Sequence, residues 1–429
     1  MAELSKFAEE IIVEILSRLP PKSLMRFKCV RRSWSTLINN PNFAAKHLSS
    51  SKGTKLSSSS TTILLSRFLI TDLNPVEMEM VLSLFNVRND FDGCFLEDIH
   101  FPHSMGLECR GEFKATGFTF QMSCHCDGII CLADYGQKPT IVLCNPAIKE
   151  FKLLPESQLA LSSPGFFPTA AVGFGCDLKS KNYKVVRLIH SGRDHNDQVN
   201  YNVIVIHPPK AEVYNLLTDS WKEIKSDGLV KENTIVLPYW NAQTNGIYFK
   251  GILYWCALEH EKVSKVAYAG GDEQNETELM NAHIISFDIG DETFHVTHIG
   301  SYDDCFLVGD VLGLWKESIT LCVHSMTTLN IWVMDDFGSG KGSWTKYLAF
   351  EPVVKITSQL ALFGKSDEQF ALVACDFSVV ILYDIFTNKF NYIPLNGALL
   401  HCTRAVEYVS SIVSVKEGNK LDMGASWAL

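Results

Sequence analysis

Four segments of this chain repeat one pattern, in which a short apolar run ends in Asn or Asp and an aromatic residue follows six positions later. The four pairs are Asn145 with Phe151, Asn215 with Trp221, Asp288 with Phe294 and Asp384 with Phe390. Asn and Asp leave a strand by hydrogen bonding to their own backbone in a turn, and the aromatic side chain anchors the returning strand in a buried layer. The repeat therefore predicts a series of strand–turn–strand units and not a set of unrelated domains.

The spacing of the copies indicates the architecture. A fifth copy, Asp335 with Trp344, is longer by three residues, and successive copies begin 70, 73, 47 and 49 residues apart. A spacing near 50 residues fits propeller blades of four strands. The apolar runs that would form the inner strands lie at residues 128–132, 183–187, 251–255 and 370–373. We predict an all-β domain over residues 63–412, a β-propeller of six to eight blades, with a β-sandwich array as the alternative.

Residues 1–48 have a helical pattern instead. Pro20 and Pro21 end the first helical stretch, because an interior proline lacks the amide hydrogen and clashes with the preceding turn. The apolar residues that recur at the spacing of a helix face are Ile11, Ile12, Ile15, Leu16 and Leu19, then Leu24 and Phe27, then Trp34, Leu37 and Ile38. We predict a small domain of three helices here, so the whole chain is α+β by segments.

A domain of this size leaves much of its apolar surface exposed. That surface therefore meets either a partner protein or the all-β body of the same chain. Residues 49–62 include seven serines and are predicted to form a linker, so that head and body are separate units. Residues 413–429 are predicted to form an unstructured tail.

The charge is divided unevenly along the chain. Residues 1–48 contain eight Lys or Arg and four Asp or Glu, a net charge of +4, and the formal charge of −10 for the whole chain leaves −14 for the other 381 residues. This balance argues against nucleic-acid binding, for which a strongly basic domain is usual. The basic residues Lys22, Arg26, Lys28, Arg31 and Arg32 form either a solvated helix face or a docking surface for an acidic partner.

Thirteen cysteines, an odd number, are scattered along a chain too large to need disulfides, which predicts a protein of the cytoplasm, or also of the nucleus. The most apolar stretch is too short for a bilayer, so no membrane is expected. His100, His103, Cys124, His125, Cys126 and Cys131 suggest a zinc site. However, the single-residue gap between Cys124 and Cys126 is tighter than usual zinc spacing, and we predict burial of these thiols and no metal. No catalytic motif is present, so neither an enzyme nor a cofactor is predicted.

The head resembles an F-box. The residues that carry the resemblance are Leu19-Pro20-Pro21-Lys22-Ser23-Leu24-Met25-Arg26-Phe27-Lys28-Cys29-Val30, then Ser33-Trp34, Leu37-Ile38 and Pro41-Asn42-Phe43. The resemblance implies a helical element that binds the Skp-type adaptor, and through it a cullin, in a Skp–cullin–F-box ubiquitin ligase. It implies adaptor-binding roles for Leu16, Leu19, Pro20, Leu24, Phe27, Val30, Trp34 and Leu37. Where the family opens with Leu-Pro and an acid, this chain has Phe7-Ala8-Glu9-Glu10, without the proline that preorganises a first helical turn.

The body, over roughly residues 110–412, resembles the kelch-like F-box-associated domain of plant F-box proteins. Its marks include Cys144-Asn145-Pro146, Gly173-Phe174-Gly175, Tyr183-Lys184-Val185-Val186, Ala211-Glu212-Val213-Tyr214, Ser286-Phe287-Asp288 and Ile331-Trp332-Val333-Met334-Asp335. Within that group the head, residues 211–214 and residues 331–336 are most similar to S-locus F-box proteins. That similarity implies a pollen receptor that targets S-type ribonucleases in self-incompatibility.

Together these features predict a non-catalytic substrate receptor of a ubiquitin ligase. An acidic body suits a basic target such as an S-type ribonuclease. Two alternatives stay open: an F-box receptor for an unrelated plant protein, and a propeller that binds a small molecule in its central channel. The sequence does not identify the target or the loops that contact it.

Overall fold

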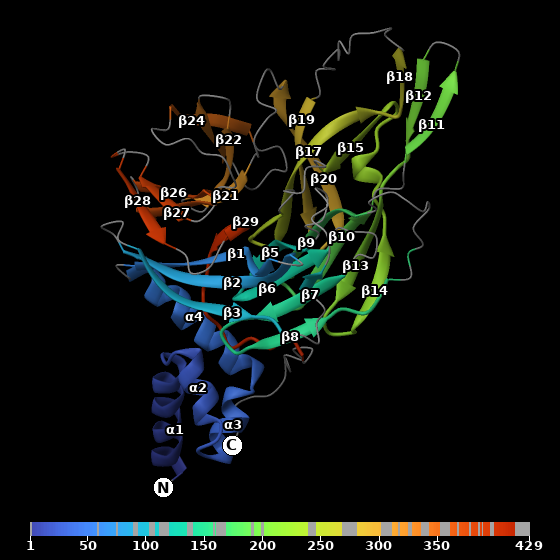
Figure 1. Cartoon of the computed structure of the whole chain (residues 1–429). Coiled ribbons are helices and arrows are strands. Elements are labelled where there is room, and N and C mark those ends of the chain that lie inside the picture. The colour runs from blue at the N-terminus through green and yellow to red at the C-terminus, as the bar shows by residue number, and fades with distance from the viewer. Residues whose placement is uncertain are drawn as a thin grey trace.

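The computed structural model places a helical domain at one end of the molecule and a β-propeller at the other (Figure 1). It describes residues 2–57, 60–73, 76–88, 93–102, 108–110, 120–134, 140–157, 159, 169–189, 193–198, 201–238, 246–267, 281–301, 311–315, 318–324, 328–335, 343–351, 361–366, 369–376, 379–384, 387, 389–394 and 399–416. The predicted helical head and propeller body are therefore confirmed, and the sandwich array is not the fold.

The helical domain has four helices, one more than predicted. They are α1 (Ala2–Ser17), α2 (Pro21–Phe27), α3 (Arg32–Ile38) and α4 (Pro41–Ser57). Helix α4 occupies most of the stretch for which a linker was predicted. One face of it, with Phe43, Ala44, His47 and Leu48, is buried. Tertiary contacts of this face order a helix whose serine-rich second half has little tendency to fold alone.

The propeller strands form five sheets of four or more strands and one smaller sheet. Blade 1 contains β1 (Ser60–Leu73), β2 (Val76–Arg88), β3 (Gly93–His100), β4 (Glu108–Arg110) and β29 (Leu399–Glu407). Blade 2 contains β5 (Phe120–Cys126), β6 (Ile129–Asp134), β7 (Ile141–Asn145) and β8 (Glu150–Leu153). Blade 3 contains β9 (Thr169–Cys176), β10 (Tyr183–Ile189), β13 (Lys210–Asn215) and β14 (Ser220–Ile224).

The remaining sheets follow the same order along the chain. Blade 4 contains β15 (Thr234–Pro238), β16 (Ile247–Phe249), β17 (Ile252–Glu261), β19 (Asn281–Asp288) and β20 (Thr293–Ser301), preceded by a short 3-10 helix, η2 (Asp227–Leu229). The eight-stranded sheet contains β21 (Val311–Trp315), β22 (Ser318–His324), β23 (Leu329–Asp335), β24 (Ser343–Phe350), β25 (Ala361–Ser366), β26 (Gln369–Asp376), β27 (Val379–Asp384) and β28 (Lys389–Pro394). The smaller sheet, which we call the arm, contains β11 (Arg193–Gln198), β12 (Tyr201–Ile206) and β18 (Val263–Ala267).

Five sheets of blade size are thus detected among the described residues, where six to eight blades were predicted. The difference arises in the eight-stranded sheet, because its two four-stranded meanders join edge to edge through one parallel pair, Leu314 with Phe363. Blade 1 closes the ring, since its strand order is β29-β1-β2-β3 and β29 is the last strand among the described residues.

The repeated pattern forms the predicted turns between the two outer strands of a blade. The Asn145 side chain accepts a hydrogen bond from the Ala147 amide, and the Asp288 side chain accepts one from the Gly290 amide. The aromatic residue lies directly opposite the residue before Asn or Asp in the strand register: Cys144 with Phe151, Tyr214 with Trp221, Phe287 with Phe294, and Tyr383 with Phe390. Two of these pairs, Tyr214 with Trp221 and Phe287 with Phe294, have their rings in contact, and each contributes roughly 0.5–1.5 kcal/mol beyond its buried area.

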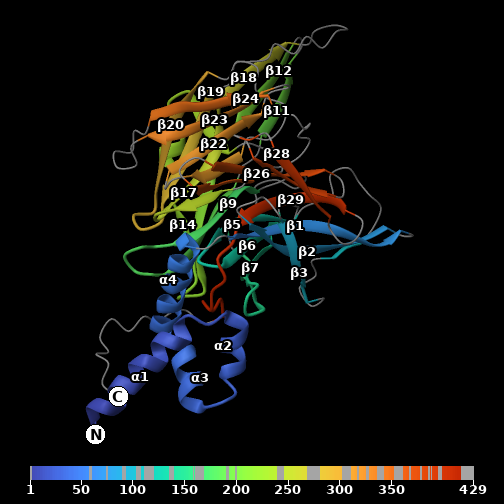
Figure 2. The same cartoon turned by 90° about the vertical axis from the view of Figure 1, so that its left-hand side faces the viewer.

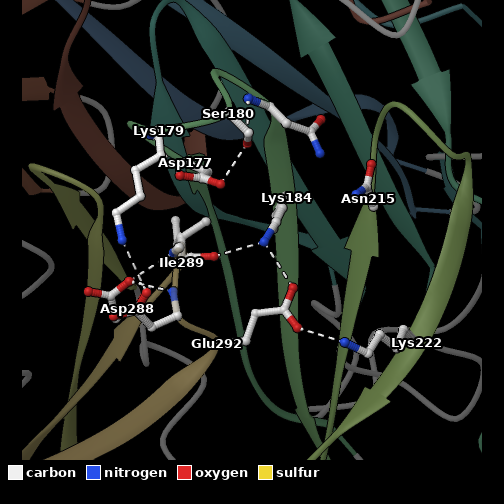
Figure 3. A network of polar contacts seen from close by, with 12 residues as sticks. Asp177, Lys179, Ser180, Lys184, Asn215, Lys222, Asp288, Ile289 and Glu292 are labelled. Carbon is white, nitrogen blue, oxygen red and sulfur yellow. Dashed lines mark hydrogen bonds and ion pairs between the residues drawn. The ribbon is translucent and has the colours of Figure 1, made fainter.

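Polar contacts join strands β10 and β14 of blade 3 to the outer turn of blade 4 (Figure 3). The buried Lys184 Nζ donates to the Ile289 carbonyl and to Glu292, both at 2.9 Å, and Lys222 Nζ donates to the other Glu292 oxygen at 3.0 Å. Burial opposes ionisation of Glu292, but the hydrogen bonds from Lys184 and Lys222 outweigh it and lower the pKa of this carboxyl group. These residues hold the two blades together, and their opposite charges neutralise each other within the network.

A second polar cluster lies in blade 4. Glu259 accepts hydrogen bonds from Lys231 at 2.6 Å and Thr234 at 2.7 Å, and it lies 3.1 Å from His283 Nε2. Burial raises the pKa of Glu259, but these hydrogen bonds outweigh it and lower the pKa to about 2. The pKa of His283 is also lowered, because burial, with smaller contributions from the charges of Lys231 and His298, outweighs the upward effect of Glu259. The folded state therefore favours ionised Glu259 and neutral His283.

Acid is expected to weaken this blade. A carboxyl group whose pKa is depressed on folding stabilises the protein above its unfolded pKa, here 4.5, and this contribution is lost as the pH falls towards about 2. At neutral pH Glu259→Gln should lower the free energy of unfolding by about 3 kcal/mol. Urea denaturation of both proteins at a series of pH values checks this. A wild-type advantage that stays constant between pH 4.5 and about 2 would contradict it.

The end of the described chain also differs from its prediction. An unstructured tail was predicted from residue 413, whereas Val413 and Val415 are buried in the core that blades 2, 3 and 4 share. The rest of the predicted tail, residues 417–429, lies outside the described residues.

Candidate functional site

The four helices surround one apolar core. Leu16 of α1, Leu24 of α2, Ile38 of α3 and Phe43 of α4 are buried in it. Phe27 and Trp34 cover the core with their rings in contact, at a centroid distance of 5.6 Å. Helices α2 and α3 have only seven residues each and would be marginal in isolation, so their packing around this core keeps them folded.

The structure brings the sequence-predicted adaptor residues together but places them at different depths. Leu16 and Leu24 lie inside the core, and Leu19, Phe27, Trp34 and Leu37 are half-buried around it. Pro20 and Val30 are exposed. Burial thus separates residues that support the helices from residues whose side chains are free to meet another protein.

Among the residues of this domain whose burial is described, three large apolar side chains are exposed: Ile11 at 45% and Ile15 at 57% on α1, and Val30 at 65% in the connection between α2 and α3. Ile11 and Ile15 are missing from the sequence-predicted set, although both belong to the apolar helical pattern. Their exposure depends on which face of α1 packs against the core. Arg26, Arg31 and Arg32 are exposed near Val30 along the chain, so charged residues flank this apolar position.

The helical domain also contacts the propeller. This agrees with one of the two alternatives from the sequence, in which the head meets the all-β body of the same chain. Lys22 of α2 forms an ion pair with Glu97 of β3 at 2.8 Å. Lys52 of α4 forms one with Asp127 at 2.7 Å, and Asp127 also accepts a hydrogen bond from Tyr183 at 3.0 Å. Head and body are therefore in direct contact and are not separated by a linker.

The contacts of blade 2 identify the face of the propeller that meets the helices. Its first connection contains Asp127, the partner of Lys52, and its third contains Ile148, which packs against the helical core. In an antiparallel meander the first and third connections lie at one end of the blade and the second lies at the other. The short outer turns therefore belong to the helix-facing side, and the second connections belong to the opposite face.

The arm is built from second connections of two neighbouring blades. Strands β11 and β12 are inserted between β10 and β13, and β18 is inserted between β17 and β19. The insertions pair with each other, from Tyr201 with Ala267 to Val205 with Val263. Figures 1 and 2 both show the arm at the end of the molecule farthest from the helices. This sheet is additional to the four-stranded pattern of the blades.

The cysteine cluster is structural. Cys124, Cys126 and Cys131 are buried free thiols in the shared propeller core, as predicted for Cys124 and Cys126, and burial raises the pKa of each. His100 is exposed on β3 and pairs with Glu79, whereas His103 lies outside the described residues. In the part of the chain that is described, no group of His, Cys, Asp or Glu is arranged to hold a metal ion.

Comparison with known families agrees with this architecture. The profile of the F-box domain matches residues 4–46, and the profile of the F-box associated beta propeller domain matches residues 96–415. The chain belongs to the F-box proteins with an F-box-associated propeller. As members of this family, such chains are non-catalytic substrate adaptors, and the F-box implies binding to the Skp-type adaptor of a Skp–cullin–F-box ligase.

Individual relatives of this F-box protein come from a plant. An F-box/kelch-repeat protein of Arabidopsis thaliana is 26% identical over 413 residues, which cover 94% of each chain. The F-box/WD-40 repeat-containing protein 1 of the same plant is 23% identical over 347 residues, 80% of this chain and 68% of its own. Among solved structures, a chain of a nidogen/laminin complex covers 80% of this chain and 97% of its own, at 11% identity and a TM-score of 0.38.

No helix in the described part of this F-box protein has the length and apolar character needed to span a membrane.

Proposed function

We propose that this F-box protein binds the adaptor with the exposed side of its helices and holds a protein target on the opposite face of the propeller. The observation that carries the proposal is that the helices and the arm lie on opposite faces of the propeller. The helices contact the first and third connections of blade 2, and the arm is built from second connections of blades 3 and 4. Connections on a rigid β scaffold vary without loss of the fold, so they suit target recognition.

The adaptor-binding face is proposed to include Leu19, Pro20, Phe27, Val30, Trp34 and Leu37 of the sequence-predicted set, together with Ile11 and Ile15. Leu16 and Leu24 are proposed to act through the core that holds these residues in position. The exposed Arg26, Arg31 and Arg32 favour an acidic surface on the adaptor.

The target is proposed to be a basic protein, specifically an S-type ribonuclease. The similarity of residues 211–214 and 331–336 to S-locus F-box proteins supports this assignment, and so does the charge of −14 on residues 49–429. The proposed location is the cytoplasm, or the nucleus, which fits the free thiols of Cys124 and Cys176.

A protein target is favoured over a small molecule in the central channel. The Arg404 guanidinium of β29 donates to the carbonyl oxygens of Met122 and Ser123 on β5 and, at 2.9 Å, to that of Gly246. These partners lie on or next to the innermost strands, and Arg404 is buried among them. Protein atoms therefore fill this part of the centre.

The proposal predicts salt-sensitive capture of a basic ribonuclease. The full chain, bound to its adaptor, is immobilised and exposed to a purified S-type ribonuclease at increasing NaCl concentration. Capture should weaken as salt screens the opposite charges. Replacing residues 191–207 with a short Gly-Ser turn removes β11 and β12 and should weaken capture by about tenfold or more while adaptor binding is retained.

The matched control is Leu217→Ser, which changes an exposed apolar residue in the β13–β14 turn on the helix-facing side and should leave capture unchanged. Absence of ribonuclease capture by the wild-type protein would count against the ribonuclease assignment. Undiminished capture after removal of β11 and β12 would count against the arm as the target-binding element.

A further inference from the structure

The segment that follows strand β29, residues 408–416, connects the propeller to the F-box. Figure 2 shows it leaving β29 and descending towards the helices. At its start the Tyr408 amide donates to the Thr62 carbonyl at 2.9 Å, next to the pairing of β1 with β29. The segment therefore begins at the point where the two ends of the propeller chain close the ring.

Blade 2 binds this C-terminal segment tightly. Asn145 Nδ2 donates to the carbonyl oxygens of Ser411 at 3.1 Å and Val413 at 2.8 Å. Glu150 Oε2 accepts a hydrogen bond from the Val415 amide at 3.1 Å. Val413 and Val415 are buried in the shared propeller core. Hydrogen bonds from side chains of blade 2 to the backbone of the segment, together with apolar burial, thus fix the segment on the propeller.

The first connection of blade 2 leaves no space beneath the segment. Gly128 has a φ of +81°, and a Cβ added to it would lie 2.6 Å from both the Val409 carbonyl oxygen and Ser411 Oγ. Only glycine has both the required backbone conformation and the absence of a side chain at this contact.

Ile412 belongs to the opposite side of the same segment. Its side chain is 5% exposed and is buried in the F-box core with Leu16, Leu24, Ile38 and Phe43. Its neighbours Ser411 and Val413 contact the propeller, and alternate side chains of an extended chain point to opposite sides. One residue of the C-terminal segment therefore completes the core of the N-terminal helical domain.

We propose that residues 408–416 make the order of the F-box helices depend on closure of the propeller. When β29 pairs with β1, Ile412 is held at the F-box core and the helices pack around it. When β29 is displaced, Ile412 leaves that core and the helices lose a buried side chain. The adaptor then meets an ordered F-box only on receptors whose propeller is complete. This last consequence rests on the proposed function, whereas the dependence of helix order on propeller closure does not.

The size of the helices is the physical reason for this dependence. Helices α2 and α3 have seven residues each, fewer than an isolated helix needs for stability in water. Loss of a large apolar side chain from a small core leaves a cavity that the remaining side chains fill only in part. Local opening of α2 and α3 should therefore become much more frequent without Ile412.

Hydrogen exchange in the full-length protein tests the proposal without any partner. Ile412→Ala should accelerate amide exchange in α2 and α3 by about tenfold or more. Val406→Ala acts from a distance, because Val406 is buried in the propeller core on β29 and is not part of the F-box core. It should accelerate exchange in the same helices by about threefold.

Leu321→Ala is the matched control, since Leu321 is equally buried but lies on β22, in a core cluster that contains no residue of the C-terminal segment. It should change exchange in α2 and α3 by less than about twofold. If Ile412→Ala prevents folding, Glu150→Gln provides a milder change that weakens the hold on Val415. Unchanged helix exchange in Ile412→Ala and Val406→Ala, or equal acceleration by Leu321→Ala, would overturn the proposal.

Discussion

Replacing Glu212 with alanine is expected to lower the free energy of unfolding by about 3–5 kcal/mol, because it leaves the buried Arg187 without its counter-charge. The two residues lie opposite each other on β13 and β10, 1% and 5% exposed, with Arg187 Nη2 at 2.5 Å from Glu212 Oε1. Burial lowers the pKa of Arg187 and the charge of Glu212 opposes this shift, so Glu212 stabilises the buried guanidinium cation.

The effect of Glu212→Ala should extend beyond the ion pair. The other Glu212 oxygen accepts a hydrogen bond from Ser157 at 2.5 Å, and the Arg187 guanidinium lies over the Trp221 ring at 5.5 Å. Trp221 in turn donates to the Pro155 carbonyl at 2.8 Å. Loss of the carboxylate therefore also loosens the connection between blades 2 and 3.

Urea denaturation checks this prediction, with Glu223→Ala as the control. Glu223 pairs with Glu212 in the register of β14 but is exposed, so its loss should cost less than about 0.5 kcal/mol. The double variant Arg187→Met with Glu212→Leu should recover most of the loss, because replacing both charges leaves no unpaired ion. Equal destabilisation by Glu212→Ala and Glu223→Ala would contradict the explanation.

The parts of the fold that the sequence predicted depend on short-range chemistry. The Asn145 and Asp288 turns follow from side chains that bond to amides two residues away, so six-residue spacing was sufficient to locate them. The number of sheets depends on long-range pairing instead. Nothing near Leu314 or Phe363 in the sequence indicates that their strands join two meanders into one sheet.

The candidate site divides in the same way. Helical periodicity identified the apolar residues of the F-box, but a helix that is apolar on several sides does not reveal which side faces a core. That choice is made by residues far along the chain, Ile148 and Ile412, which pack against the helices from the propeller. The adaptor-binding set implied by the F-box resemblance therefore included the buried Leu16 and omitted the exposed Ile15, although both belong to the periodic pattern. Helix α4 was missed for a related reason, because its order depends on contacts and not on composition.

Substitution of the exposed apolar residues is expected to weaken adaptor binding strongly without unfolding the F-box. Val30→Asp and Ile15→Asp each place a charge on a side chain that is more than half exposed. Each should weaken adaptor binding by about 100-fold, because a carboxylate would have to be desolvated at an apolar contact. Thermal melting should be nearly unchanged, since substitutions at exposed positions usually alter stability by less than about 0.5 kcal/mol. Calorimetric titration with purified adaptor and a melting curve for each variant check the prediction.

A substitution at a half-buried position distinguishes the loss of an adaptor contact from the loss of F-box folding. Trp34→Ala removes a half-buried ring that contacts the Phe27 ring in a tilted arrangement, so it should reduce both adaptor affinity and melting temperature. Ala45→Asp adds the same charge at an exposed position of α4 and should leave both quantities unchanged. If Val30→Asp and Ile15→Asp bind the adaptor as the wild type does while Trp34→Ala fails, the adaptor contacts another side of the helices. In that case the surface containing Ile11, Ile15 and Val30 is not the adaptor-binding face, and its exposure requires a different partner.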